Sequence, residues 1–129
     1  MASAKRRCHD SGAAAVEFAL LAPVLLLLLV GIVEFGRVYN AQVTVTAAAR
    51  EGAREMAVRN DLTAAIDRVM AAAPALNPAL TAGQISITPA DCQAGDDVSV
   101  EVTYPVPLLT GIIVEDITVT GRGVMRCGG

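Results

Sequence analysis

Residues 13–33 read AAAVEFALLAPVLLLLLVGIV, and this stretch decides how the rest of the chain is organised. It contains one charged residue, Glu17, and an unbroken aliphatic run at 25–30. As an α-helix it would extend about 31 Å at about 1.5 Å per residue, close to the ~30 Å hydrocarbon core of a bilayer. A helix buried in a soluble core rarely has apolar side chains on every face. The stretch therefore predicts a transmembrane helix rather than a core helix.

The polar segment before this stretch carries Lys5, Arg6 and Arg7 against one acid, Asp10. Such a basic flank stays in the cytoplasm by the positive-inside rule, so residues 34–129 are expected outside it. A secretory signal peptide has the same order, but its apolar core is usually about 7–15 residues and ends at a small-residue cleavage site. Here the run is longer and no small-residue cluster follows it closely. We expect a single-pass anchor in the cytoplasmic membrane.

The composition of the chain excludes several functional classes. Its 129 residues allow one small domain besides the membrane helix. With 10 Lys and Arg against 13 Asp and Glu, a nucleic-acid-binding role is not expected. The single histidine, His9, precedes the apolar stretch, so residues 34–129 cannot form a histidine-based triad or metal site. Because phosphate-binding glycine motifs and CxxC pairs are also missing, we expect neither an enzyme nor a cofactor.

Acidic residues offer one weak metal candidate. Asp91, Asp96 and Asp97 lie near an expected turn, where they could hold calcium weakly. Solvated loop acids are the simpler interpretation, and no metal site is assigned.

Residues 34–59 keep a helical character after the apolar stretch, because alanines and oppositely charged residues at helical spacing are frequent there. No proline interrupts 24–73. One helix is therefore expected to run outward from the membrane, loosened at Gly31, Gly36 and Gly52. Asn60 and Asp61 then indicate a break and an N-cap, followed by a second, amphipathic helix over 62–73.

Beyond residue 84, apolar and polar residues alternate with the period of a β-strand. The alternation predicts strands at 85–88, 97–104 and 117–120, with connections at 95–96 and 105–111. The expected fold is α+β: a long N-terminal transmembrane helix, a second short helix and a small three-stranded antiparallel sheet. The apolar face of the sheet is expected to pack on the second helix.

Two cysteines lie in the part expected outside the cytoplasm, where disulfides persist. A disulfide between Cys92 and Cys127 would close a loop and stabilise the fold by about 4 kcal/mol in the chain-entropy model. The alternative is two free thiols. Cys8 lies on the cytoplasmic side and is expected to stay reduced.

The segment from Ser11 to Arg54 resembles the TadE-like family of minor pilins and pseudopilins, which belong to tight-adherence, Flp-type pilus systems. The resemblance rests on GAAAVEFAL at 12–20, Pro23 with the leucine run, EFGR at 34–37 and AREGAR at 49–54. It implies a part in the assembly or function of such a pilus. The implied partners are the lipid bilayer, prepilin peptidase, other pilins or TadE-like subunits, and the tight-adherence secretion machinery. The resemblance also implies incorporation into an extracellular pilus.

In such prepilins, a membrane aspartic peptidase is expected to cut directly after the glycine. Carried over to this chain, the cut falls between Gly12 and Ala13. It makes 1–12 a leader, 13–33 the transmembrane helix and 34–129 the extracytoplasmic TadE-like α+β domain. Glu17 becomes the fifth residue of the mature chain, followed by Phe18, an aromatic residue that Flp-type prepilins carry at this place.

Glu17 is a functional candidate on physical grounds too, because an ionisable residue in a membrane helix costs about 2.5–3.5 kcal/mol on insertion scales. A new amine at Ala13, on the same or a neighbouring subunit, could neutralise the carboxylate. The alternative is a carboxylate that extends to the cytoplasmic interface. Pro23 would remove one helical hydrogen bond and kink the span, which neighbouring helices tolerate.

A different class of protein also fits these patterns. The alternative is an unprocessed single-pass membrane protein whose outer domain binds a ligand or a partner. The N-terminal sequence of the protein recovered from membranes would separate the two hypotheses.

Overall fold

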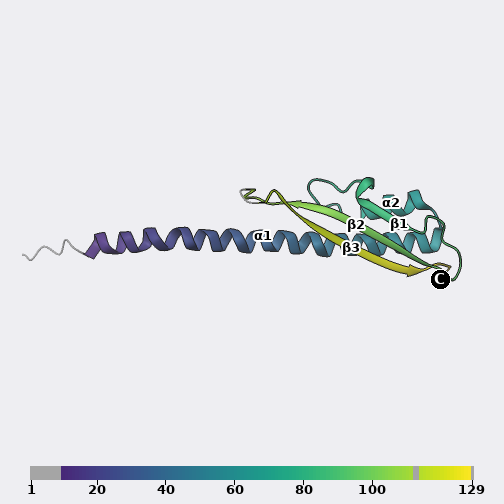
Figure 1. Cartoon of the computed structure of the whole chain (residues 1–129), viewed down its shortest axis with the longest axis horizontal. Coiled ribbons are helices and arrows are strands. Elements are labelled where there is room, and N and C mark those ends of the chain that lie inside the picture. The colour runs from purple at the N-terminus through teal and green to yellow at the C-terminus, as the bar shows by residue number, and fades with distance from the viewer. Residues whose placement is uncertain (1–9, 112–113, 129) are drawn as a thin grey trace, which may run out of the picture. The chain divides into compact units, whose positions relative to one another are not determined.

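The computed structural model describes residues 10–111 and 114–128. Its elements, in chain order, are α1 (Asp10–Arg59), α2 (Leu62–Ala71), a short 3₁₀ helix η1 (Ala82–Gln84), β1 (Ile85–Thr88), β2 (Asp97–Pro107) and β3 (Asp116–Arg126) (Figure 1). The chain divides into two compact units, a first unit Met1–Phe35 and a second unit Gly36–Gly129. The expected α+β class, with a long apolar helix, a short helix and a three-stranded antiparallel sheet, is confirmed.

The long helix is continuous over its whole described length. It passes through Pro23 and through Gly31, Gly36 and Gly52 without a break. The glycines therefore do not interrupt the helix, and the expected loosening there stays a prediction. The leader residues Lys5, Arg6, Arg7, Cys8 and His9 lie outside the described residues.

The break between the two helices falls where the sequence indicates it. Asn60 adopts a left-handed conformation at φ 50°, which ends α1. The side chain of Asp61 then accepts a hydrogen bond from the backbone N–H of Ala64 at 3.0 Å and caps α2. The short helix ends at Ala71, two residues before the expected end at 73.

The sheet has the order β1-β2-β3, and both pairs are antiparallel. β2 and β3 are longer than expected, and the connection placed at 105–111 is wrong at its start. Pro105 pairs with Thr118 and Pro107 with Asp116, so both prolines belong to β2. β1 pairs only with residues 99–102 of β2, in the first half of that strand. Beyond Val102, no strand among the described residues pairs with this edge of β2, and an open edge tolerates proline.

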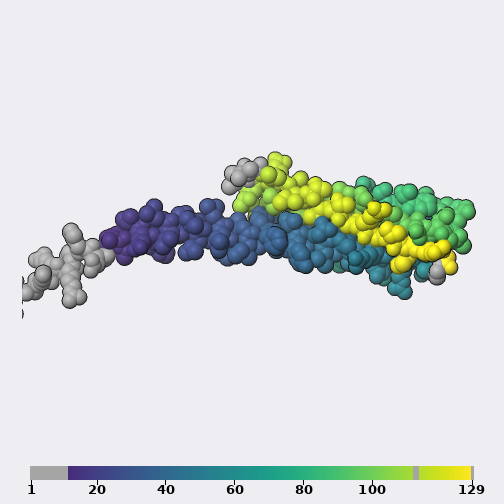
Figure 2. Space-filling view, turned by 60° about the horizontal axis from the view of Figure 1, so that its bottom comes forward, coloured from purple at the N-terminus to yellow at the C-terminus, as the bar shows by residue number. Residues whose placement is uncertain are grey.

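The main cover of the sheet is the second half of α1 rather than the short helix. The buried core joins small residues of α1 to the inward side chains of the sheet: Ala41, Val45, Ala48, Ala49, Ala53, Val100, Val102, Tyr104, Val106 and Val119. α2 shares this core through Val69. In the space-filling view, β3 (yellow) lies along the blue and teal part of α1 (Figure 2). The expectation that the sheet packs on the second helix is therefore corrected, because the alanine face of α1 allows a closer approach.

Candidate functional site

Gly12 and Ala13 lie in the first turns of α1, and both are exposed. A Cβ atom placed on Gly12 would have no described atom within 4 Å. Gly52 differs, because a Cβ atom there would collide with the side chain of Val69 on α2. Packing among the described residues thus requires glycine at Gly52 and not at Gly12. Another molecule could therefore recognise Gly12 by the small size of this residue.

Glu17 follows Ala13 by about one helical turn and is exposed. Its neighbours on the helix are apolar and largely exposed: Val16 63%, Phe18 70%, Leu20 70% and Leu21 55%. Within residues 10–111 and 114–128, no hydrogen bond or ion pair engages the Glu17 carboxylate. A carboxylate in an apolar setting is stabilised by a cation, which for Glu17 must come from outside these residues.

The leucine-rich part of α1 presents its side chains outward on every side. Val24 and Leu25 to Leu29 are between 57% and 74% exposed. α1 is the one helix in the described residues that is long and apolar enough to cross a membrane, and none of its most apolar window is buried. A core helix of a soluble protein would bury such a window. The helix therefore indicates a membrane-anchored protein whose apolar surface contacts lipid or other helices.

The last part of the same helix is constrained by folding instead. Ala49 and Ala53 are fully buried against the sheet. The carboxylate of Glu51 accepts a hydrogen bond from the guanidinium of Arg68 on α2 at 3.2 Å. The alanines thus hold α1 against the sheet. The hydrogen bond of Glu51 and the close approach at Gly52 hold α1 against α2. The AREGAR motif is thus explained by packing inside the second unit.

The family model described as TadE-like protein matches residues 12–54, which lie wholly within α1. The segment is similar to TadE-like proteins. Its match begins at Gly12, which packing does not require, and ends at Arg54 in the motif that binds α2. No curated protein and no solved structure matches the chain.

The TadE-like match and the apolar helix together support a coarse assignment. The family suggests a minor pilin associated with a tight-adherence pilus, and the exposed apolar helix suggests that it is anchored in a membrane. The apolar helix and the family match are consistent with lipid and pilus components as partners. The sheet region lies outside the matched segment.

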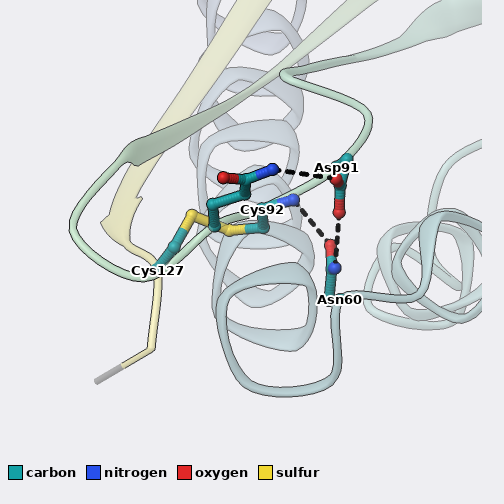
Figure 3. The surroundings of a disulfide bond; sticks show 5 residues. Asn60, Asp91, Cys92 and Cys127 are labelled. Carbon is teal, nitrogen blue, oxygen red and sulfur yellow. Dashed lines mark hydrogen bonds between the residues drawn. A yellow bond between two sulfur atoms is a disulfide. The ribbon is translucent and has the colours of Figure 1, made fainter.

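A disulfide closes the end of the second unit where α1 ends (Figure 3). It joins Cys92, in the connection before β2, to Cys127, directly after β3, with the Cα atoms 5.6 Å apart. The side chain of Asn60 braces this region: its oxygen accepts from the backbone N–H of Cys92 at 2.6 Å, and its amide donates to Asp91 at 2.7 Å. The hydrogen bond from Asn60, with a second from Gln93, lowers the pKa of Asp91.

One of the acids considered for calcium has a partner within the protein. Asp91 is engaged by the amide of Asn60. No group of three or more His, Cys, Asp or Glu side chains suited to a metal ion occurs in the regions that the structure describes.

Sequence reasoning missed a hollow in the second unit. It is lined by Arg54, Ala57, Val58, Met125 and Arg126, so two guanidinium groups border an apolar floor. The hollow depends on β3 reaching Arg126, and the sequence predicted a strand that ended at 120. The sequence hides this part of β3, because glycines stand at the buried positions 121 and 123, where the alternation requires apolar side chains.

Proposed function

We propose that this chain is a minor pilin or pseudopilin of a Flp-type, tight-adherence pilus. It is made as a precursor with the leader 1–12, and prepilin peptidase cuts it between Gly12 and Ala13. The observation that carries the proposal is the TadE-like match from Gly12 to Arg54 along a helix whose leucine-rich part is exposed on all sides. The basic leader stays in the cytoplasm, and residues 34–129 lie outside it.

The two parts of the matched segment have different tasks in this proposal. The first carries the cleavage site, anchors the protein in the cytoplasmic membrane and later packs against other pilin helices. The second fastens the helix to the extracytoplasmic domain through Gly52 and Glu51. The division explains why glycine is dispensable for packing at Gly12 and required at Gly52.

Glu17 provides the attraction between subunits. Cleavage converts the backbone amide of Ala13 into a cationic amine, and this amine pairs with Glu17 of a neighbouring subunit. The carboxylate costs about 2.5–3.5 kcal/mol in the bilayer as an isolated group. Pairing offsets part of that cost, so the assembled state is favoured over the single subunit. Phe18 adds apolar contact area beside the pair.

The protein has no catalytic activity and needs no cofactor in this role. Its partners are the bilayer, the peptidase, other pilins or TadE-like subunits, and the secretion machinery of the pilus.

Replacement of Glu17 tests the proposal in cells that contain the peptidase and the pilus system. The variant Glu17→Gln keeps the size of the side chain and its hydrogen bonding but removes the charge. We expect normal insertion and cleavage, with a sharp fall in the amount recovered with pilus components. The matched control is Glu34→Gln, at the other end of the apolar run, which should leave recovery unchanged.

Two other outcomes contradict parts of the proposal. Undiminished recovery of a normally processed Glu17→Gln variant would show that the carboxylate only extends to the interface. A wild-type protein that is never cleaved and never recovered with pilus components would instead support the unprocessed membrane protein with a binding domain.

A further inference from the structure

β3 has a long open edge in the second unit. It is the outer strand of the sheet, and no strand among the described residues pairs with its other side. The open edge of β2 beyond Val102 carries Pro105 and Pro107, which have no N–H to donate. β3 has 11 residues, no proline and an unbroken register with β2. One open edge is therefore protected against pairing with another chain, and the other is not.

Two backbone hydrogen bonds fix which residues of β3 face this edge. The N–H of Leu108 donates to the carbonyl of Glu115 at 3.0 Å. The N–H of Cys127 donates to the carbonyl of Asp96 at 2.8 Å. Both bonds continue the β2–β3 register, and hydrogen-bonded pairs alternate with non-bonded ones in an antiparallel ladder. The odd-numbered residues of β3 therefore bond to β2. The even-numbered residues direct their backbone groups to the open edge: Asp116, Thr118, Thr120, Arg122, Val124 and Arg126.

The second half of this edge is open. The carbonyl of Thr120 accepts a hydrogen bond from the side-chain amide of Gln42 on α1 at 2.8 Å. Beyond it, the backbone groups of Arg122, Val124 and Arg126 have no partner in the described part of the chain. All three residues are exposed, and β3 (yellow) is visible beside α1 in the space-filling view (Figure 2). An extended segment of another chain can therefore reach these groups.

The hollow between α1 and β3 lies at the same part of the edge. It holds about 410 Å³ and is lined by Met125 and Arg126 of β3 and by Arg54, Ala57 and Val58 of α1. Arg54 and Arg126 make no hydrogen bond or ion pair with any described residue. Because Met125 is odd-numbered, its side chain lies on the face of the sheet that α1 covers. A side chain opposite Met125 on an added strand would enter this hollow.

We propose that the edge from Arg122 to Arg126 binds an extended acidic segment of another protein, which adds to the sheet as an antiparallel strand. Backbone hydrogen bonds provide the affinity, and the side chains along the edge provide the specificity. Acidic residues of the segment lie opposite the two arginines. A β-branched residue lies opposite Val124, and an aliphatic one opposite Met125 fills the hollow. From its N-terminus the segment thus reads acid, aliphatic, β-branched, any residue, acid. The proposal does not rest on membrane anchoring, cleavage or pilus assembly.

A second copy of the chain is a poor partner for this edge. Two β3 strands that pair antiparallel through the same open residues would be centred on Val124. Arg122 of each copy would then lie opposite Arg126 of the other, and like charges directly opposite each other destabilise a sheet. Within the sheet, Glu101 and Asp97 lie opposite the two arginines but form no ion pair with them. Both guanidinium groups thus remain available to carboxylates of a different strand.

Peptide binding to the full chain in non-ionic detergent tests the proposal. The probe is the fluorescein-labelled peptide Thr-Glu-Leu-Val-Ala-Glu-Thr, and fluorescence anisotropy gives its dissociation constant. N-methylation of the valine blocks an amide that faces β3, whereas N-methylation of the alanine blocks an amide that faces away. We expect the first change to weaken binding about tenfold or more and the second to alter it less than about twofold.

A charge variant of the protein tests the role of the arginines. Arg126→Gln should weaken binding about two- to fivefold, as expected for the loss of an exposed ion pair. The matched control is Arg59→Gln, which removes the same charge at an exposed position outside the hollow and should leave binding unchanged.

Three results would overturn strand addition. The first is equal weakening by the two N-methylations, or no binding of the parent peptide at millimolar concentration. The second is equal binding of a scrambled peptide of the same composition, which would show charge attraction alone. The third is a dimer of the chain in sedimentation that the peptide dissociates, which would assign the edge to a second copy.

Discussion

Gly123 of β3 lies directly against the backbone of α1, so that a Cβ atom on it would be 2.5 Å from the carbonyl oxygen of Ala49. Gly121 makes the same approach two residues earlier, against the backbone of Val45. The backbones of strand and helix are thus in direct contact, and only glycine permits such a close approach. This contact fixes the long helix to the sheet in the second unit.

Substitution of this glycine should weaken the second unit. In Gly123→Ala the added methyl group meets the backbone of Ala49, which cannot move aside as a flexible side chain can. Overpacking typically costs about 1–3 kcal/mol, and we expect the upper part of that range. Chemical denaturation of the full chain in detergent, followed by circular dichroism, measures the loss. Gly83→Ala is the control, because a Cβ atom there meets nothing within 4 Å. Equal unfolding free energies for the two variants would refute the backbone contact.

Loss of the disulfide should destabilise the same unit. Replacement of Cys92 and Cys127 by serine is expected to cost about 2–5 kcal/mol, since the open chain gains entropy in its unfolded state. Thiol labelling of the denatured, unreduced protein gives a direct check. It should modify only Cys8 in the precursor and no cysteine in the mature form. Labelling of both outer cysteines would contradict the bond.

The stability of the second unit should fall at alkaline pH because of Tyr104. Burial raises the pKa of Tyr104, and its hydroxyl donates to the carbonyl of Pro78 at 2.7 Å. A raised folded-state pKa gives stability that is complete below the unfolded value, about 10, and is lost as the pH rises through the folded value. Tyr104→Phe should lose about 0.5–1.5 kcal/mol at pH 7 with the hydrogen bond. Unfolding of both proteins between neutral and alkaline pH should show a steeper loss for the wild type, and parallel curves would exclude this role.

Periodicity in the sequence predicts which helices and strands occur better than it predicts where they end. The break at Asn60 and Asp61 was found because both residue types favour it. The sequence predicts a shorter β2 because Pro105 favours a loop, whereas the open edge of the sheet accepts proline. β3 was cut short because Gly121 and Gly123 interrupt the apolar alternation. Those inward positions are glycine because α1 fills the space, which is a tertiary constraint.

The candidate site was predictable to a different degree in each unit. Gly12 and Glu17 are candidates because of a local motif in front of an apolar run, and their roles stay predictions. The structure adds that Gly12 has no packing role among the described residues. The hollow between Arg54 and Arg126 joins residues distant in the chain. Predicting this hollow requires knowledge of how β3 runs along α1.

The orientation of the protein can be tested by a fusion at its C-terminus. The basic residues before the span predict a cytoplasmic N-terminus and an outer second unit. A reporter that is active only outside the cytoplasm, fused after Gly129, should therefore be active. A silent reporter, together with activity of a cytoplasmic reporter at the same position, would reverse the orientation.

Cleavage can be examined with two glycine variants of the same helix. In Gly12→Leu the residue before the cut becomes bulky, so we expect the precursor to accumulate while the helix still inserts. Gly31→Leu lies in the same helix, and its Cβ atom also meets nothing within 4 Å. It should be processed normally. Similar processing of both variants would argue against recognition at Gly12.

The N-terminus of the wild-type protein tests the proposed function most directly. The protein is isolated from the membranes of cells that contain an active prepilin peptidase, and its intact mass and N-terminal peptide are measured. Processing between Gly12 and Ala13 predicts a mature chain that begins at Ala13 and retains Glu17 as its fifth residue. A chain that begins at Met1 or Ala2 in those cells would contradict the assignment as a processed pilin.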